Sequence, residues 1–148
     1  MSLNWILFCL QLLCTLYMTG LIWFVQIVHY PLMAAVGARD FITYENSHTT
    51  LTTWVVLPPM CMELLCAALM LRLKPPGLSN GQALLGLSLV MLIWASTFFL
   101  QVPCHARLEQ GFDVLTHQRL VTSNWLRTVG WSVRSLFLLW ILVQQRNP

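Results

Sequence analysis

The sequence predicts an all-α membrane protein, namely a four-helix transmembrane bundle with up-down-up-down topology. First, 57% of its 148 residues are hydrophobic and only 9% are charged, and the mean hydropathy of +0.69 is unlike that of a soluble domain. Second, four apolar stretches are each long enough to cross about 30 Å of hydrocarbon. We therefore expect one transmembrane domain over residues 1–148, with spans at about 4–28, 50–71, 82–102 and 124–143.

The first span is a nearly unbroken apolar run over residues 4–28. It lacks a basic amino-terminal region and a small-residue cleavage site, and it is too long for a signal peptide, so we expect it to remain in the membrane. Its far end carries Gln26 and His29, which lie three residues apart on one helical face, before Pro31 closes the segment.

The second helix is predicted to begin at Asp40, outside the bilayer, and to run to about Leu71. Several of its residues, most of them polar, fall on one stripe at helical period: Glu45, His48, Thr52, Pro59 and Glu63. Glu63 lies well inside the apolar part, where a charged side chain is expensive unless it faces the bundle interior with a partner.

The third span follows the clearest loop in the sequence, RLKPPGLSNG at 72–81, whose prolines and glycines break helices. The span is predicted over 82–102. Its polar positions again advance by three or four residues: Trp94, Ser96 or Thr97, Gln101 and, beyond Pro103, His105. This spacing gives the third helix a polar face as well.

The last helix, predicted over 113–146, carries the strongest polar signal in the chain, because Arg127 and Arg134 lie seven residues apart in its apolar half. Three further residues repeat this spacing: His117, Asn124 and Trp131. At 3.6 residues per turn all five share one broad face. Charged side chains at membrane depth mark a candidate functional site.

The predicted topology places all four histidines at one end of the bundle, which we call the histidine end: His29, His48, His105 and His117. The opposite end, with both termini and the 72–81 loop, is the terminal end. We expect the second and fourth helices to extend beyond the bilayer at the histidine end. Lys and Arg are nearly balanced between the ends, and the amino terminus then favours a cytoplasmic terminal end and an outward histidine end.

Glu63 and Arg134 are predicted to form an ion pair between the second and fourth helices. Glu63 lies fifteen residues past His48, and Arg134 lies seventeen residues past His117. At 1.5 Å per residue both side chains are roughly 22 to 26 Å along their helices. The pair either only fixes helix register or, with Arg127, floors a polar chamber open to the histidine end. In the second case the candidate catalytic residues are Glu63, Arg127, Arg134 and His48.

A metal centre at the histidine end is a second candidate site. Glu45 and His48 form an E-x-x-H at i, i+3, and bundle metal sites use such pairs. Imidazole suits iron, copper or zinc, so one of these ions is a candidate cofactor. The candidate ligands are His29, Glu45, His48, His105, Glu109 and His117. The same groups could instead be metal-free acid–base or substrate-binding groups, or histidines hydrogen-bonded for structure.

Two tryptophans on the polar faces, Trp94 and Trp131, could wall a pocket for a flat or lipophilic molecule, with Gln101 and Asn124 beside them. The alternative is that these aromatic rings only pack the helices.

The order of the motifs resembles a group of short, uncharacterised four-span bacterial membrane proteins. The motifs are Q-x-x-H-Y-P, Y-E-x-x-H, P-P-M-x-x-E, V-P-x-H and a closing H-x-x-L-V-x-x-N-W-x-R-T-x-x-W-x-x-R. The matching positions include Gln26, His29, Tyr44, His48, Pro59, Glu63, His105, His117, Asn124, Trp125, Arg127, Trp131 and Arg134. The resemblance implies a multi-pass protein of the bacterial inner membrane and carries no activity with it.

Two functions fit this pattern. The first is a small membrane enzyme, either metal-dependent or metal-free, acting on a lipophilic small molecule that enters from the bilayer or from the histidine end. The second is a non-catalytic binding, carrier or assembly subunit. The lipid bilayer is an expected partner and a homo-oligomer is possible, whereas no basic run suggests nucleic acid.

Overall fold

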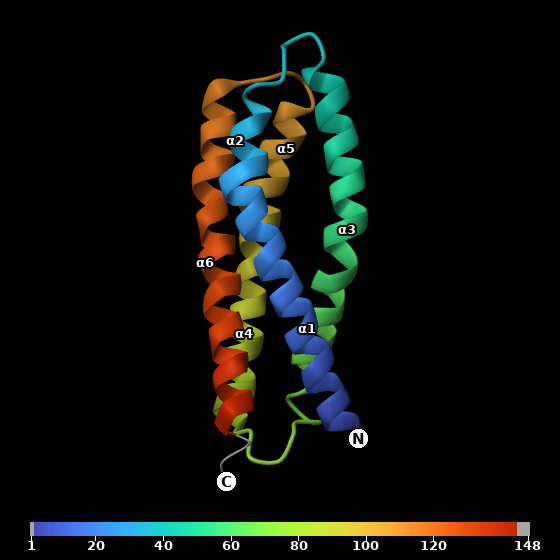
Figure 1. The fold of residues 1–148 in the computed structure, drawn as a ribbon, viewed down its shortest axis with the longest axis vertical. Coiled ribbons are helices and arrows are strands. Elements are labelled where there is room, and N and C mark those ends of the chain that lie inside the picture. Colours follow the sequence, from blue (N-terminus) through green and yellow to red (C-terminus); the bar gives the residue numbers. More distant parts are fainter. Residues whose placement is uncertain (1, 145–148) are drawn as a thin grey trace.

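The computed structural model describes residues 2–144. It contains four helical segments that are long and apolar enough to cross a membrane: Leu3–Met33, Phe41–Leu69, Asn80–Leu108 and Val114–Gln144. Figure 1 shows these segments running alternately up and down, so that the described chain starts and finishes at the same end of the bundle. The predicted up-down-up-down bundle is confirmed, and the chain is a multi-pass membrane protein. The predicted helix end at Arg146 lies outside the described residues.

The first and third segments each contain a π-helical turn. The first comprises α1 (Leu3–Phe24), the turn η1 (Val25–His29) and α2 (Tyr30–Met33); the third comprises α4 (Asn80–Ser96), the turn η2 (Thr97–Gln101) and α5 (Val102–Leu108). Pro31 and Pro103 each lie two residues past a π turn. A proline ring clashes with the carbonyl group four residues earlier, and the wider turn makes room for it. Both helices therefore continue past their prolines to the histidine end.

The helices form a square in which α3 (Phe41–Leu69) and α6 (Val114–Gln144) each pack against both α1 and α4. Consequently α3 and α6 face each other diagonally across the centre. The helices α4 and α6 approach closely at Gly130, where an added Cβ would lie 3.0 Å from Cγ1 of Ile93. Small residues at such a crossing allow the backbones to approach. Because the four segments have 29 or 31 residues each, the predicted extension of only the second and fourth helices is not confirmed.

The terminal end of the bundle is filled by apolar side chains from all four helices. The buried members of this cluster are Leu7, Phe8, Cys66, Met70, Leu78, Ala83, Leu138 and Ile141. The outer faces are also apolar, as shown by Trp54, Phe99 and Leu115, which are 75%, 78% and 75% exposed. Since a bilayer rather than water covers such faces, buried polar groups are the informative ones. Apart from Gln11, they lie between the level of Glu63 and the histidine end.

Helix α6 begins where the sequence predicts, because Asp113 supplies its amino-terminal cap. The Asp113 carboxylate accepts a hydrogen bond from the backbone N–H of Thr116 at 2.8 Å and another from its hydroxyl. These hydrogen bonds stabilise the charged form and lower the pKa of the Asp113 carboxyl below its usual range. The cap fixes where α6 starts and hence the depth of its polar face.

Candidate functional site

Glu63 lies at the centre of the bundle in an ion pair with Arg134, as the depth of the two residues predicts. Arg134 Nε donates to the Glu63 carboxylate at 2.6 Å, and both residues are at most 1% exposed. Trp131 Nε1 donates to the other carboxylate oxygen at 3.0 Å, and the Thr15 hydroxyl also donates to Glu63. Arg134 additionally donates to the carbonyl group of Gly86. This cluster joins all four transmembrane segments and neutralises both charges.

A second polar layer lies one heptad nearer to the histidine end. Asn124 Nδ2 donates to Gln26 Oε1 at 2.9 Å, and Gln26 Nε2 donates to the Val121 carbonyl group at 3.2 Å. Arg127 Nη1 donates to Asn124 Oδ1 at 3.3 Å, and its guanidinium carbon lies 5.2 Å from the centre of the Trp131 ring. Within residues 2–144 the Arg127 side chain forms no ion pair. Arg127 and Arg134 therefore differ in that only Arg134 has a carboxylate partner.

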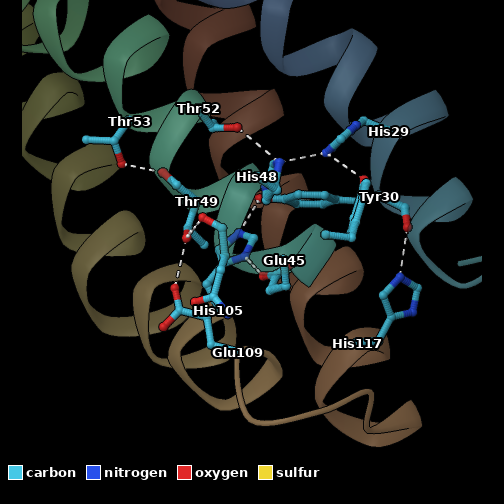
Figure 2. Close-up of polar contacts among 12 residues, drawn as sticks. His29, Tyr30, Glu45, His48, Thr49, Thr52, Thr53, His105, Glu109 and His117 are labelled. Atoms are coloured by element: carbon cyan, nitrogen blue, oxygen red, sulfur yellow. Dashed lines mark hydrogen bonds and ion pairs between the residues drawn. The ribbon is translucent and has the colours of Figure 1, made fainter. Parts of the chain in front are cut away.

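The histidine end contains two connected pairs of titratable side chains (Figure 2). In the first pair His29 Nε2 lies 2.9 Å from His48 Nδ1, and the Thr52 hydroxyl lies 3.0 Å from the same His48 nitrogen. In the second pair His105 Nδ1 lies 2.6 Å from the Glu45 carboxylate. The rings of His48 and His105 are 5.2 Å apart, so the two pairs form one cluster.

His105 has both ring nitrogens engaged. Because a carboxylate can only accept, Nδ1 carries the hydrogen that is shared with Glu45, and in the neutral ring Nε2 accepts from the Tyr30 hydroxyl at 3.0 Å. Glu45 is fully buried, and its second oxygen has no hydrogen-bond partner among the described residues. A carboxylate that orients an imidazole in this way fixes its tautomer, and general acid–base catalysis uses the same arrangement.

The remaining two predicted ligands lie outside this cluster. His117 Nε2 contacts the Tyr30 backbone carbonyl at 2.8 Å, on the far side of Tyr30 from His48 and His105 (Figure 2). Glu109 accepts a hydrogen bond from Thr49 at 2.8 Å. Over residues 2–144 no group of three or more His, Cys, Asp or Glu side chains is arranged to hold a metal ion. The metal centre stays a prediction. Among its candidate ligands, two pairs of donor atoms lie close together: Glu45 with His105 at 2.6 Å, and His29 with His48 at 2.9 Å.

A cavity of about 420 Å³ lies between α3 and the α4–η2–α5 segment at the histidine end. Its polar wall carries His48, His105, Thr49, Thr52, Gln101, Glu109, Tyr30 and Arg127. Its apolar wall carries Val56, Met60 and Trp94, and its outer rim includes Thr53 and Leu57 of α3 with Phe98 and Val102 of the opposite segment. These four rim residues are exposed on the lipid-facing surface, so the cavity opens sideways between two helices. Its size is in the usual range for small-molecule sites.

The cavity divides the predicted site residues into two sets. His48, Arg127, Trp94 and Gln101 line it, together with His105 and Glu109. Glu63, Arg134, Asn124 and Trp131 lie deeper, in the two polar layers of the bundle core. Only one of the three predicted floor residues, Arg127, therefore reaches the cavity.

Tyr30 was not predicted as a site residue, and in the sequence it appears only within the Q-x-x-H-Y-P motif. Its hydroxyl bonds to His105, its carbonyl group bonds to His117, and its ring is 3% exposed in the cavity wall. The signal that could have found it is its position next to His29, at the end where every histidine gathers.

Comparison of the chain with protein-family models, with curated proteins and with solved structures gives no match. The function is therefore argued from the geometry of the cavity and of the cluster beside it.

Proposed function

We propose that this protein is a small membrane enzyme that binds an amphiphilic small molecule in the cavity between α3 and the α4–η2–α5 segment. The observation that carries the proposal is the composition of that cavity. One wall presents imidazole, hydroxyl, amide and guanidinium groups, and the rim presents apolar side chains to the lipid. A molecule with one polar and one apolar end matches both surfaces, and it can enter from the bilayer without crossing water.

The chemistry favoured by the cluster is proton transfer at His105 and His48. Glu45 orients the His105 ring, and the Tyr30 hydroxyl connects its other nitrogen to the cavity wall. In this hydrogen-bonded series, Tyr30 or His105 can accept a proton from a bound molecule. The proton is then held between His105 and Glu45. The partnered Glu63–Arg134 pair has a structural role in this proposal, because both of its charges are already neutralised.

The alternative function is a non-catalytic binding or carrier protein. A carrier needs a path to both membrane faces, whereas the apolar cluster of α1, α3, α4 and α6 fills the terminal end. That arrangement supports a site reached from one end and from the bilayer. It leaves non-catalytic binding as the competing proposal.

The test blocks the cavity at its rim. Thr53→Trp places a large ring at the cavity mouth, and Thr50→Trp places the same ring at an exposed position of α3 that does not line the cavity. We expect solvent extracts of the purified full-length protein to contain an amphiphile that is present in wild type and Thr50→Trp and depleted in Thr53→Trp. Extracts that do not differ between the two variants would contradict a binding site in this cavity.

The catalytic part is tested with the amphiphile recovered in that experiment. Wild-type protein incubated with it in deuterium oxide should introduce deuterium at a carbon position, and His105→Gln should abolish the exchange without abolishing binding. Binding without any exchange or conversion would favour the non-catalytic alternative.

A further inference from the structure

Arg127 is a buried cation that lacks the partner its neighbour has. It is 6% exposed, and its Nε atom has no hydrogen-bond partner among the described residues. Arg134, seven residues later on the same face of α6, is neutralised by Glu63. A buried charge is normally paired, because an unpaired one loses its hydration without compensation.

The groups that surround Arg127 are uncharged. They are Asn124 at 3.3 Å, the ring of Trp131 at 5.2 Å and the hydroxyl group of Tyr30. The carboxylates of the bundle interior and of the cavity wall bond to other residues. Glu45 bonds to His105, Glu63 bonds to Arg134, and Glu109 accepts from Thr49. Among residues 2–144 no charged group therefore pairs with the guanidinium, and its charge is available to a bound molecule.

Arg127 also lies in the wall of the cavity, which gives such a group a place to bind. Guanidinium is the side chain best suited to bind carboxylate and phosphate oxygens, because its planar donors match their geometry. Thr52, Gln101 and His105 line the same cavity and offer further hydrogen-bonding groups near the charge. The exposed apolar residues of the rim, such as Leu57 and Phe98, lie on the side where an alkyl chain would leave the cavity.

We propose that the ligand of this cavity is an anionic amphiphile whose carboxylate or phosphate head group binds Arg127 and whose apolar part extends between α3 and η2 toward the lipid. This inference rests on the proposed function and names the class of its substrate. The charge of Arg127 favours an anionic head group, and the apolar rim favours a ligand with an alkyl chain.

The test uses full-length protein in nanodiscs of phosphatidylcholine, which is zwitterionic and has no net charge. Three probes have the same alkyl chain: decanoate, decyl phosphate and decanol. We expect at least one of the anions to bind about 10- to 100-fold more tightly than decanol, the range that a charge-assisted hydrogen-bonded pair provides. Arg127→Gln should abolish this preference while decanol still binds, which also shows that the variant is folded. Arg127→Lys should retain part of it.

Arg119→Gln is the matched control, because Arg119 is an exposed residue of the same helix and its loss changes the net charge equally. The preference should survive in this variant. Inorganic phosphate alone distinguishes a free anion from an amphiphile, and binding as tight as that of decyl phosphate would overturn the amphiphile assignment.

Equal binding of the anions and decanol to wild-type protein would overturn the anionic assignment. If Thr53→Trp then weakens both equally, the cavity remains a binding site for an uncharged amphiphile. If Thr53→Trp changes neither, the proposed function fails as well.

Discussion

The contrast between the two buried arginines predicts opposite effects of the same substitution. Replacing Arg134 by Met leaves the Glu63 carboxylate in the bundle centre with only the neutral donors Thr15 and Trp131. Breaking one side of a buried ion pair costs about 3–5 kcal/mol, so we expect Arg134→Met to lower the free energy of unfolding by that amount.

Arg127→Met should change the free energy of unfolding much less than Arg134→Met. The substitution loses one 3.3 Å hydrogen bond to Asn124 and one contact with the Trp131 ring, together worth about 2–3 kcal/mol. It also removes the desolvation penalty of an unpaired ion, which is several kcal/mol. These terms nearly cancel, so we expect the free energy of unfolding to stay within about 1 kcal/mol of wild type or to rise.

The assay is reversible unfolding of the full chain by urea in micelles of nonionic dodecyl maltoside, followed by circular dichroism, because an anionic detergent would belong to the proposed class of ligand. A double variant, Glu63→Met with Arg134→Met, is the control for the ion pair, because it replaces both charges and should recover most of the loss. An Arg127→Met variant that loses 3 kcal/mol or more would show that Arg127 has a charged partner in the folded protein. That result would refute the reasoning behind the anion site.

Three other predictions follow from the structure. The capping hydrogen bonds lower the pKa of the Asp113 carboxyl in the folded protein. Their stabilisation is therefore present above the pKa of the unfolded chain and is lost as the pH falls through the folded pKa. Asp113→Ala should lower the melting temperature at pH 7 and lower it less in acid. Gly130→Ala should lower the free energy of unfolding by about 1–3 kcal/mol, because the new Cβ would lie 3.0 Å from the isoleucine of α4. Gly20→Ala is the control, because no atom lies within 4 Å of its Cβ position, and it should be neutral or stabilising in the same assay. If the predicted metal binds, elemental analysis should find near-stoichiometric iron, copper or zinc that disappears in the His29→Ala, His48→Ala double variant. Wild-type protein that stays metal-free after reconstitution would refute that prediction.

Much of the fold and part of the site could be predicted from local helix geometry. The number of spans follows from hydrophobic length, and the polar face of the last helix follows from a period of 3.6 residues per turn. The Glu63–Arg134 pair could also be predicted, because the rise per residue fixes how deep each side chain lies. These quantities depend only on the position of a residue along its own helix.

The division of roles within the polar face could not be predicted in this way. Arg127 and Arg134 share a face and an apolar setting, and depth along the helix identifies only the partner of Arg134. It does not predict that Arg127 lines a cavity without a carboxylate partner. Their difference arises because Glu63 meets α6 diagonally across the bundle, while the cavity lies between α3 and the α4–η2–α5 segment. The position of Tyr30 likewise depends on how the first segment turns at η1.

The sequence by itself therefore determined which face of each helix is polar and how deep each residue lies, because helical period and rise are properties of single helices. Only the tertiary structure decided which side chains meet. That outcome depends on the neighbours of each helix, on its rotation about its own axis and on the π turns before Pro31 and Pro103. For this reason the ion pair could be foreseen and a polar chamber could be hypothesised, whereas the set of residues that line the cavity and the unpaired charge in its wall could not be predicted.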